Sequence, residues 1–280
     1  MITQTAPAGE AHFVITMAEH MNLCSQMARA FGNDQFERLD PYQEVLHLVE
    51  NHDRGWDEYD ANPGLDPETQ LPYIISRTPT LDNMKTNRVS PEVNEAHHPY
   101  CGLLSSMHSW GLYNRRYGFS QFVVRARTTT SITVKNVYQP QVDALLADEL
   151  ARQSRLKAKL AKDPTTRSWI DEPHLFQNYK QLQFFDTLSL YFHLYHASER
   201  GDETYIHVPL SAEADCNVTV KKVNERVYSL DPFPFANDRL QLVCRGRYAK
   251  PFPIDFDQSR VGAVLKSLPA DMQTYELMAA

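Results

Sequence analysis

At 280 residues, with 42% hydrophobic and 22% charged residues, the chain has enough length and apolar content for one large domain or two small ones. With a net charge of −7 and a pI near 5.9, the protein as a whole has no electrostatic attraction for nucleic acid or anionic lipid. We therefore expect a small-molecule substrate, and neither nucleic acid nor a membrane as a partner.

The first residues and the cysteines indicate the cellular compartment in which to expect the protein. Residues 1–10 have neither a basic start nor an apolar core, so they do not predict a secretory signal. No run is long and apolar enough to predict a membrane span. The four cysteines are scattered without a C-x-x-C pair, which is typical of reduced thiols. We expect a cytoplasmic protein.

The hydrophobic pattern divides the chain into three parts. Residues 1–11 predict a frayed lead, residues 12–200 a helical domain, and residues 201–280 a β-rich part packed on the helical core. Residues 57–90 are rich in Asp, Asn, Pro and Thr and show little periodicity, so we expect a long loop that could act as a lid. The expected fold is mainly α, with a smaller antiparallel β-rich C-terminal part.

Two helices are predicted near the start of the helical domain. Met17–Phe31 carries one apolar stripe, on which His20 points inward. Tyr42–Val49 has apolar residues at three- and four-residue intervals, and the pair His52-Asp53 falls in its last turn. Gly55 is placed to end this helix in a left-handed turn. Imidazole and carboxylate are good ligands for transition metals, although such a pair alone is more often an ordinary polar helix end.

Further histidines accompany the next helix. Pro99–Leu112 predicts a helix, since Pro99 breaks or restarts the chain after His97 and His98. His108 lies on or beside the apolar face of this helix. We therefore treat His108 as a candidate functional residue, and His97 or His98 as a weaker one.

A locally basic stretch occupies residues 115–135. Its short Val-Val and Ser-Ile-Thr-Val pieces have β propensity, whereas the surrounding pattern is helical, so both structures remain open. Its aromatic residues do not interleave with the charges as a stacking platform for nucleic acid would, which favours a solvated or interface surface. Residues 142–162 then predict a charged amphipathic helix. The basic residues are Arg115, Arg116, Arg125, Arg127 and Lys135.

The longest aromatic and apolar stretch begins after Asp171 and runs to about Ala197. A helix that is apolar on nearly all sides is expected to be central. Asp186 lies in its middle, where an unpaired ionised carboxylate would be unfavourable. His193 follows Asp186 by seven residues, close to two turns, and shares its face. Asp186 therefore predicts a buried cation, and both an arginine and a metal ion remain open.

From Thr204 onward, short alternating runs with turn residues between them predict antiparallel strands. Asp231–Phe235 contains two prolines and two phenylalanines and is expected to be a rigid packing clasp. Ser259–Leu268 and Asp271–Met278 predict short terminal helices or ends. The predicted strands are Tyr205–Val208, Asn217–Val220, Arg226–Leu230 and Leu240–Cys244.

The candidate ligands occur in the order His20, His52-Asp53 and Asp186, with a glycine two residues after the first aspartate. This order resembles the HD-domain superfamily of metal-dependent phosphohydrolases. Two finer blocks, His52 to Trp56 and Asp231 to Phe235, are similar to a poorly characterised HD-like family known mainly as a domain of unknown function. The resemblance implies an HD-domain-like helical bundle.

The resemblance also implies one or two divalent transition metal ions, the first held by His20, His52, Asp53 and Asp186. Asp53 would bridge to a second ion, which would take His108 with His97 or His98. Such a mixed nitrogen and oxygen set does not distinguish iron, manganese, zinc, cobalt and nickel.

The implied activity is hydrolysis of a small phosphorylated or otherwise anionic substrate by a metal-activated water. Asp53 would act at the metal, and Arg54, Lys85 or Arg88 would hold the anionic group. Many such phosphohydrolases have lysine directly after the glycine, where this chain has Trp56. Tryptophan cannot supply that charge. Two alternatives therefore stay open, a diiron oxygenase resembling myo-inositol oxygenase and a non-catalytic metal- or ligand-binding protein.

Overall fold

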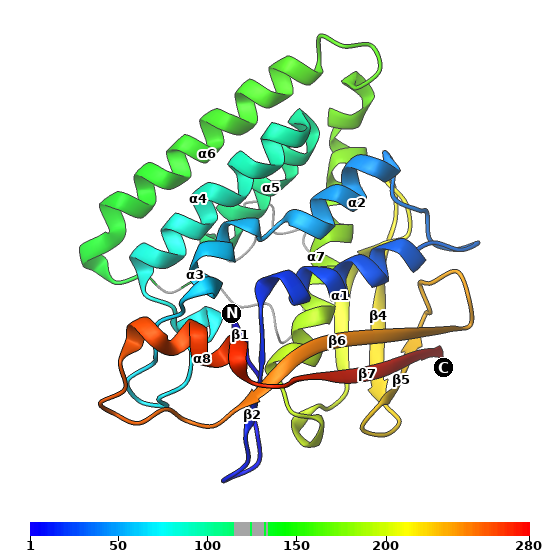
Figure 1. Ribbon diagram of the computed structural model, residues 1–280. Helices are drawn as coiled ribbons and strands as arrows, with labels where there is room; N and C mark the ends of the chain where they lie inside the picture. Colours follow the sequence, from blue (N-terminus) through cyan, green and yellow to red (C-terminus); the bar gives the residue numbers. More distant parts are fainter. Residues whose placement is uncertain (115–123, 125–131, 133) are drawn as a thin grey trace.

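Seven strands form one mixed sheet that curls into a half-barrel in the computed structural model, with helices packed against it (Figure 1). The structure describes residues 1–114, 124, 132 and 134–280. The strand order is β1-β2-β6-β7-β5-β4-β3, and β5 and β7 run parallel while the other neighbouring strands are antiparallel. The strands are β1 (Ile2–Thr3), β2 (His12–Ile15), β3 (Glu203–Pro209), β4 (Asp215–Lys222), β5 (Val227–Asp231), β6 (Arg239–Ala249) and β7 (Ala270–Ala279).

The helices form layers at increasing distance from the sheet. α1 packs on β6 and α7 packs on β3, while α5, α4 and α6 stack farther out (Figure 1). The helices predicted over residues 17–31, 42–49 and 99–112 and in the central aromatic stretch are confirmed. The helices are α1 (Met17–Ala30), α2 (Tyr42–Asn51), α3 (Asp57–Ala61), α4 (Thr80–His97), α5 (Pro99–Tyr113), α6 (Gln139–Leu160), α7 (Glu172–Leu194) and α8 (Val261–Ser267).

The mixed sheet shows that the expected mainly helical bundle with a small antiparallel part is wrong. The four predicted strands are confirmed as parts of β3 to β6, but both ends of the chain add strands. β1 lies within the expected frayed lead, and β7 replaces the helix or end expected over 271–278. In β7 only Tyr275 and Leu277 are buried on one face, so its alternation is too short to identify from sequence. The parallel pairing of β5 with β7 is a long-range contact that no local pattern encodes.

Much of the long loop expected over residues 57–90 is helical, because α3 occupies its start and α4 its end. α4 buries polar side chains instead of an apolar stripe, which is why its periodicity was missing. The Asn94 side chain donates to the Asn51 carbonyl at 2.8 Å, and Asn83 Oδ1 accepts from the Tyr113 hydroxyl at 2.7 Å. Hydrogen bonds thus replace apolar burial on this face.

α7 is the central helix that its composition predicts. Every residue from Leu175 to His193 is buried, and α7 contacts α1, α2, α5 and the sheet. Because the helix is buried on all sides, its polar side chains contact other parts of the protein instead of solvent. Among the described residues, no helix is both long and apolar enough to cross a membrane.

The segment Asp231–Phe235 packs as the expected clasp. The side-chain amide of Asn33 donates to the carbonyl oxygens of Phe233 and Phe235, and Phe31 pairs with Phe235 through an isolated bridge. The clasp therefore fastens the end of α1 to the β-rich part. By contrast, Arg115, Arg116, Arg125 and Arg127 of the basic stretch lie outside the described residues.

Candidate metal centre

Five side chains of the types that bind metal ions come together between α1, α2, α5 and α7. α1 supplies His20, the C-terminal end of α2 supplies His52 and Asp53, α5 supplies His108, and α7 supplies Asp186. All five residues are buried. The ring centroids of His20 and His52 lie 5.5 Å apart, and those of His52 and His108 lie 5.4 Å apart. Residues far apart in sequence thus form one compact cluster of imidazoles and carboxylates.

His52 is held with one ring nitrogen pointing into this cluster. Its Nδ1 donates to the Val49 carbonyl at 2.8 Å, so the neutral ring keeps its lone pair on Nε2. Burial lowers the pKa of His52, which favours this neutral form. Within the described part of the chain, Nε2 has no hydrogen-bond partner, and Asp53 Oδ2 lies 3.8 Å from it. A buried unsatisfied nitrogen is unfavourable and points to a missing partner.

His20 and Asp186 form a buried ion pair, with His20 Nε2 3.2 Å from Asp186 Oδ1. Burial alone would disfavour both charges. Cys24 and the Asp186 carboxylate nevertheless raise the pKa of His20 well above its usual value, and the hydrogen bond from His20 lowers the pKa of Asp186 to about 2. Among the described residues, the cation that Asp186 predicts is therefore this histidine.

The second nitrogen of His20 is also fixed. Ser189 Oγ donates to the Asp186 backbone carbonyl at 2.8 Å, so it accepts from His20 Nδ1, also at 2.8 Å. A hydrogen bond from the far nitrogen of a histidine is the usual way in which proteins orient a metal-binding ring. Ser189 therefore orients His20 Nε2 toward Asp186.

Two residues of this region were not among the predicted ligands. His193 is buried, and its Nδ1 lies 3.3 Å from His20 Nδ1. Burial lowers the pKa of His193 well below its usual value, so it is neutral. Cys24 lies one turn after His20, with its sulfur 3.9 Å from His20 Nε2. The sequence did contain signals for both, namely the seven-residue spacing from Asp186 and the four-residue spacing from His20.

Gly55 positions the end of α2 in a different way from the one expected. It lies in a short 3-10 turn, Arg54–Trp56, and does not adopt the left-handed conformation. A Cβ atom at this position would lie only 2.0 Å from the Thr86 carbonyl oxygen, and the Gly55 N–H donates to Ser90 Oγ at 2.9 Å. Glycine is therefore required because the turn packs directly on the backbone of α4.

Trp56, which follows Gly55, is a core residue. It is only 4% exposed, and its ring packs edge-on against Tyr59 at a centroid distance of 5.6 Å. The indole therefore stabilises the junction between α2 and α3.

The three side chains expected to hold an anionic group form ion pairs on the surface. Arg54 pairs with Asp57 at 3.2 Å in the following turn. Lys85 pairs with Glu58 at 2.7 Å, and Arg88 pairs with Asp148 at 3.4 Å. The structure therefore does not bring Arg54, Lys85 and Arg88 to the histidine cluster.

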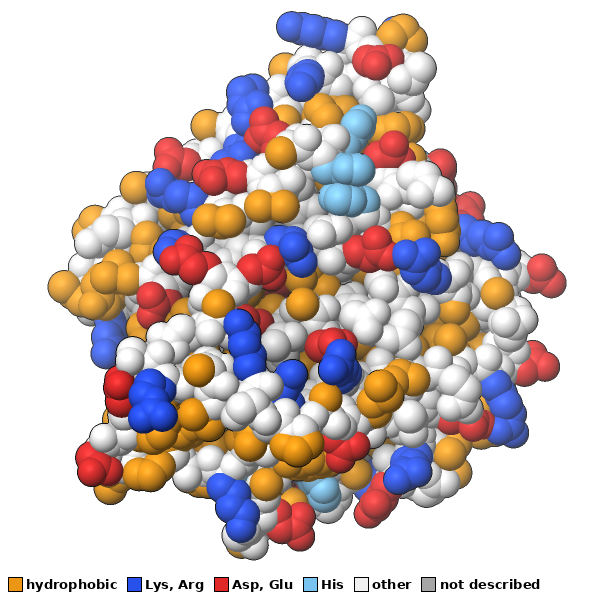
Figure 2. All heavy atoms as spheres, in the orientation of Figure 1, with side chains coloured by type: hydrophobic (Ala, Val, Ile, Leu, Met, Phe, Trp, Pro, Cys, Tyr) orange, Lys and Arg blue, Asp and Glu red, His pale blue; other side chains and the backbone are white. Residues whose placement is uncertain are grey.

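His97 and His98 also lie away from the cluster. The exposed His97 ring stacks on His47 at a centroid distance of 3.4 Å. Figure 2 shows that several histidine side chains reach the face of the molecule drawn there. His98 Nδ1 accepts from the Tyr100 N–H at 3.1 Å and caps α5. Because α4 ends at His97 and α5 begins at Pro99, both histidines lie at helix ends near the surface.

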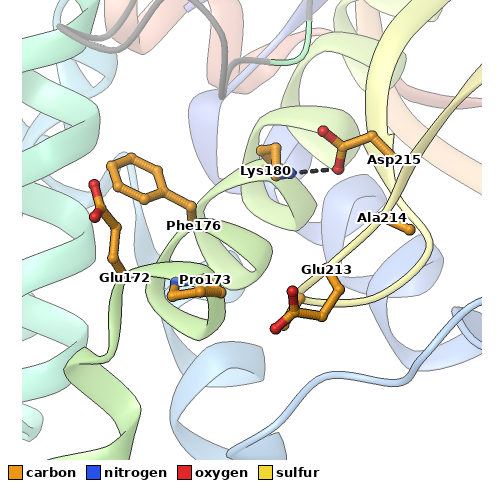
Figure 3. Close-up of a pocket in the computed structure, with 8 residues that line it drawn as sticks. Glu172, Pro173, Phe176, Lys180, Glu213, Ala214 and Asp215 are labelled. Carbon is orange, nitrogen blue, oxygen red and sulfur yellow. Dashed lines mark hydrogen bonds and ion pairs between the residues drawn. The ribbon is translucent and has the colours of Figure 1, made fainter.

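A separate hollow of about 300 Å³ lies between the start of α7 and the turn before β4. Figure 3 shows Lys180 in this hollow, ion-paired with Asp215. Glu172, Phe176 and Glu213 also line it, and no histidine is among its described lining residues. Because its one cation is already paired, the hollow does not extend the candidate metal centre.

The family comparison covers most of the chain. The model of the family described as "Protein of unknown function (DUF3891)" matches residues 1–250. No curated protein and no solved structure matches the chain, and nothing in these comparisons links the family to the HD-domain superfamily. The matched residues include every side chain of the candidate metal centre. The chain therefore belongs to the DUF3891 family of proteins of unknown function.

Proposed function

We propose that the protein is a metal-dependent hydrolase of the HD type, which acts on a small anionic substrate through a metal-activated water. One observation carries the proposal. Five ligand-type side chains from four helices share one buried cluster, and there His52 Nε2 has no hydrogen-bond partner among the described residues.

The donor set fits a divalent transition metal ion. Neutral imidazoles and carboxylates are suitable ligands for such ions, so His20 would lose the Nε2 proton that it shares with Asp186 when an ion binds. The hydrogen bond from His52 Nδ1 to the Val49 carbonyl would orient His52 as a ligand. His20, His52, Asp53 and Asp186 would hold the ion. Ligand atoms of His52, Asp53 and His108 also lie within 4.8 Å of one another, which supports a place for His108 beside them.

The two carboxylates are the least buried members of the cluster. The imidazoles of His20 and His52 are 0% exposed, whereas the carboxylates of Asp186 and Asp53 are 8% and 11% exposed. A substrate would therefore approach across the two carboxylates. A divalent ion bound there would lower the pKa of a water molecule toward neutrality and offset negative charge on the substrate. Ser189 and Val49 would keep the two imidazoles in place during this chemistry.

The diiron alternative needs a further histidine beside His108. Because His97 and His98 both lie at the surface, the described residues do not supply the full set that the oxygenase resemblance implies. We therefore do not propose an oxygenase. The non-catalytic alternative differs from the hydrolase only in turnover, which the test below measures.

The test is the metal content and the activity of purified variants. We expect roughly one equivalent or more of a transition metal in the wild-type protein, and loss of it in His52→Ala and Asp186→Ala. His207→Ala is the control, because His207 lies in β3 and is 33% exposed beside Asp215. The metal-loaded protein should release phosphate from a panel of small phosphate esters with manganese, cobalt, nickel, iron or zinc.

Two outcomes would contradict parts of the proposal. Equal metal content in all three variants would remove the assignment of the site. Stoichiometric metal with no turnover of phosphate esters or other anionic esters would support the binding-protein alternative instead.

A further inference from the structure

Cys24 lies on the face of α1 that carries His20. The two residues are four positions apart, so their side chains are neighbours on one face of the helix. Cys24 is 0% exposed, and its sulfur lies 3.9 Å from His20 Nε2. The same nitrogen lies 3.2 Å from Asp186 Oδ1. The thiol therefore borders the same space as the carboxylate.

An independent observation at His52 points to a ligand in this space. One ring nitrogen of His20, the sulfur of Cys24 and one ring nitrogen of His52 lie within 4.8 Å of one another. His52 Nδ1 is bonded to Val49, so the nitrogen that His52 can offer is Nε2. This atom is fully buried and has no hydrogen-bond partner in the residues that the structure describes.

We propose that Cys24 is a thiolate ligand of the metal centre, together with His20 and His52. The inference rests on the proposed function and deepens it, because it adds sulfur to the nitrogen and oxygen donors. When a metal ion binds, the thiol loses its proton to solvent and the sulfur coordinates the ion as thiolate. Thiolate is a soft ligand, so the centre prefers zinc, cobalt or iron over manganese or magnesium.

The competing explanation is an ordinary buried thiol. The Cys24 thiol donates a weak hydrogen bond to the Phe185 carbonyl oxygen, with 3.6 Å between sulfur and oxygen. Such a contact would satisfy the thiol, and His52 Nε2 could then bind a metal ion without the sulfur. The two explanations differ in whether the sulfur contacts a bound metal.

Cobalt(II) is the probe, because a cobalt–thiolate bond adds near-ultraviolet charge-transfer absorption. We expect this band in the cobalt-loaded wild-type protein and in Cys101→Ala, and its loss in Cys24→Ser and Cys24→Ala. Cys101 is the matched control, since it is equally buried but donates to the Glu44 carbonyl at 3.2 Å. The ratio of zinc to manganese affinity should fall by roughly tenfold or more in the Cys24 variants.

The outcomes separate the inference from the proposed function. Cobalt bound by the wild-type protein without the band would overturn the role of Cys24 and leave the hydrolase proposal standing. This result needs no variant, so it holds even if a Cys24 substitution unfolds the protein. A band that persists in folded Cys24→Ser would assign the sulfur to another cysteine and also overturn the inference. A wild-type protein that binds neither cobalt nor zinc nor any of the other candidate metals would overturn both proposals.

Discussion

Gly55 illustrates how a single residue can position part of the candidate metal centre. The missing side chain lets the Arg54–Trp56 turn rest on the α4 backbone, and this turn directly follows His52 and Asp53. A larger residue would displace the turn and with it both candidate ligands.

We expect Gly55→Ala to lower the free energy of unfolding by about 3 kcal/mol or more, because its Cβ would overlap the Thr86 carbonyl oxygen. Chemical denaturation measures this change. Gly201→Ala is the control, since a Cβ there would meet no described atom within 4 Å, and it should stay within about 0.5 kcal/mol of wild type. Equal stability of the two variants would show that the turn does not pack on α4 in this way.

The candidate ligands show what a sequence can predict at the residue scale. His20 and Asp186 could be selected because each lies among apolar residues of a predicted helix, and His52 because it adjoins Asp53 at a helix end. His97 fitted the same ligand order, but proximity in sequence to His108 does not bring it to the cluster. The rings of His97 and His47 come together because α2 and α4 meet at the surface, a tertiary contact that no spacing reveals.

At the scale of elements, α4 and α6 are joined by a charged network. Both Nη atoms of Arg155 donate to Glu95, each at 2.8 Å, and Arg152 Nη1 donates to the same carboxylate at 2.7 Å. The hydrogen bonds from Arg155 and then Arg152 lower the pKa of Glu95 below its usual 4.5. A carboxylate with a lowered pKa in the folded protein stabilises it above the unfolded-state pKa, and this contribution is lost as the pH falls.

Glu95→Gln should therefore reduce the free energy of unfolding at neutral pH by about 0.5–1 kcal/mol, since the groups are partly exposed. The difference from wild type should shrink as the pH falls below 4.5 through the lowered pKa. Urea denaturation at several pH values checks both statements. Glu92→Gln serves for comparison, because Glu92 is 54% exposed and lies 3.7 Å from Arg152. If the difference in free energy of unfolding between Glu95→Gln and wild type grew toward low pH, the predicted pH dependence would be wrong.

Elements were predictable where the apolar pattern determines them, through a periodic stripe in α1 and α2 and through a long apolar and aromatic run in α7. α4 was not, because Asn83, Asn87 and Asn94 replace its apolar stripe with hydrogen bonds. β7 was not, because its buried alternation is limited to Tyr275 and Leu277 and its pairing with β5 and β6 is long-range. In both cases tertiary contacts, which a local pattern does not record, decide the structure.

At the scale of the whole molecule, the proposed ligands connect four helices. A bound metal ion would join α1, α2, α5 and α7 and stabilise the folded state, since the unfolded chain does not hold these ligands together. At a free metal concentration about a hundredfold above Kd, the expected gain is about 2.7 kcal/mol.

Thermal unfolding with and without added zinc or cobalt measures this gain. The unfolding temperature should rise with metal concentration and return to its starting value after chelation. His52→Ala should show no such rise, while His207→Ala should respond as wild type does. A rise of equal size in His52→Ala would place the stabilising ion elsewhere.

The contact between α1 and β6 joins the helix that carries His20 to a strand near the other end of the chain. The Gln26 side chain exchanges two hydrogen bonds with the Val243 backbone, at 2.8 and 2.9 Å. On the ribosome, every proposed ligand emerges before β6 does. His20 therefore lacks the support of β6 until that strand has been synthesised, so we expect metal insertion to follow the synthesis of β6.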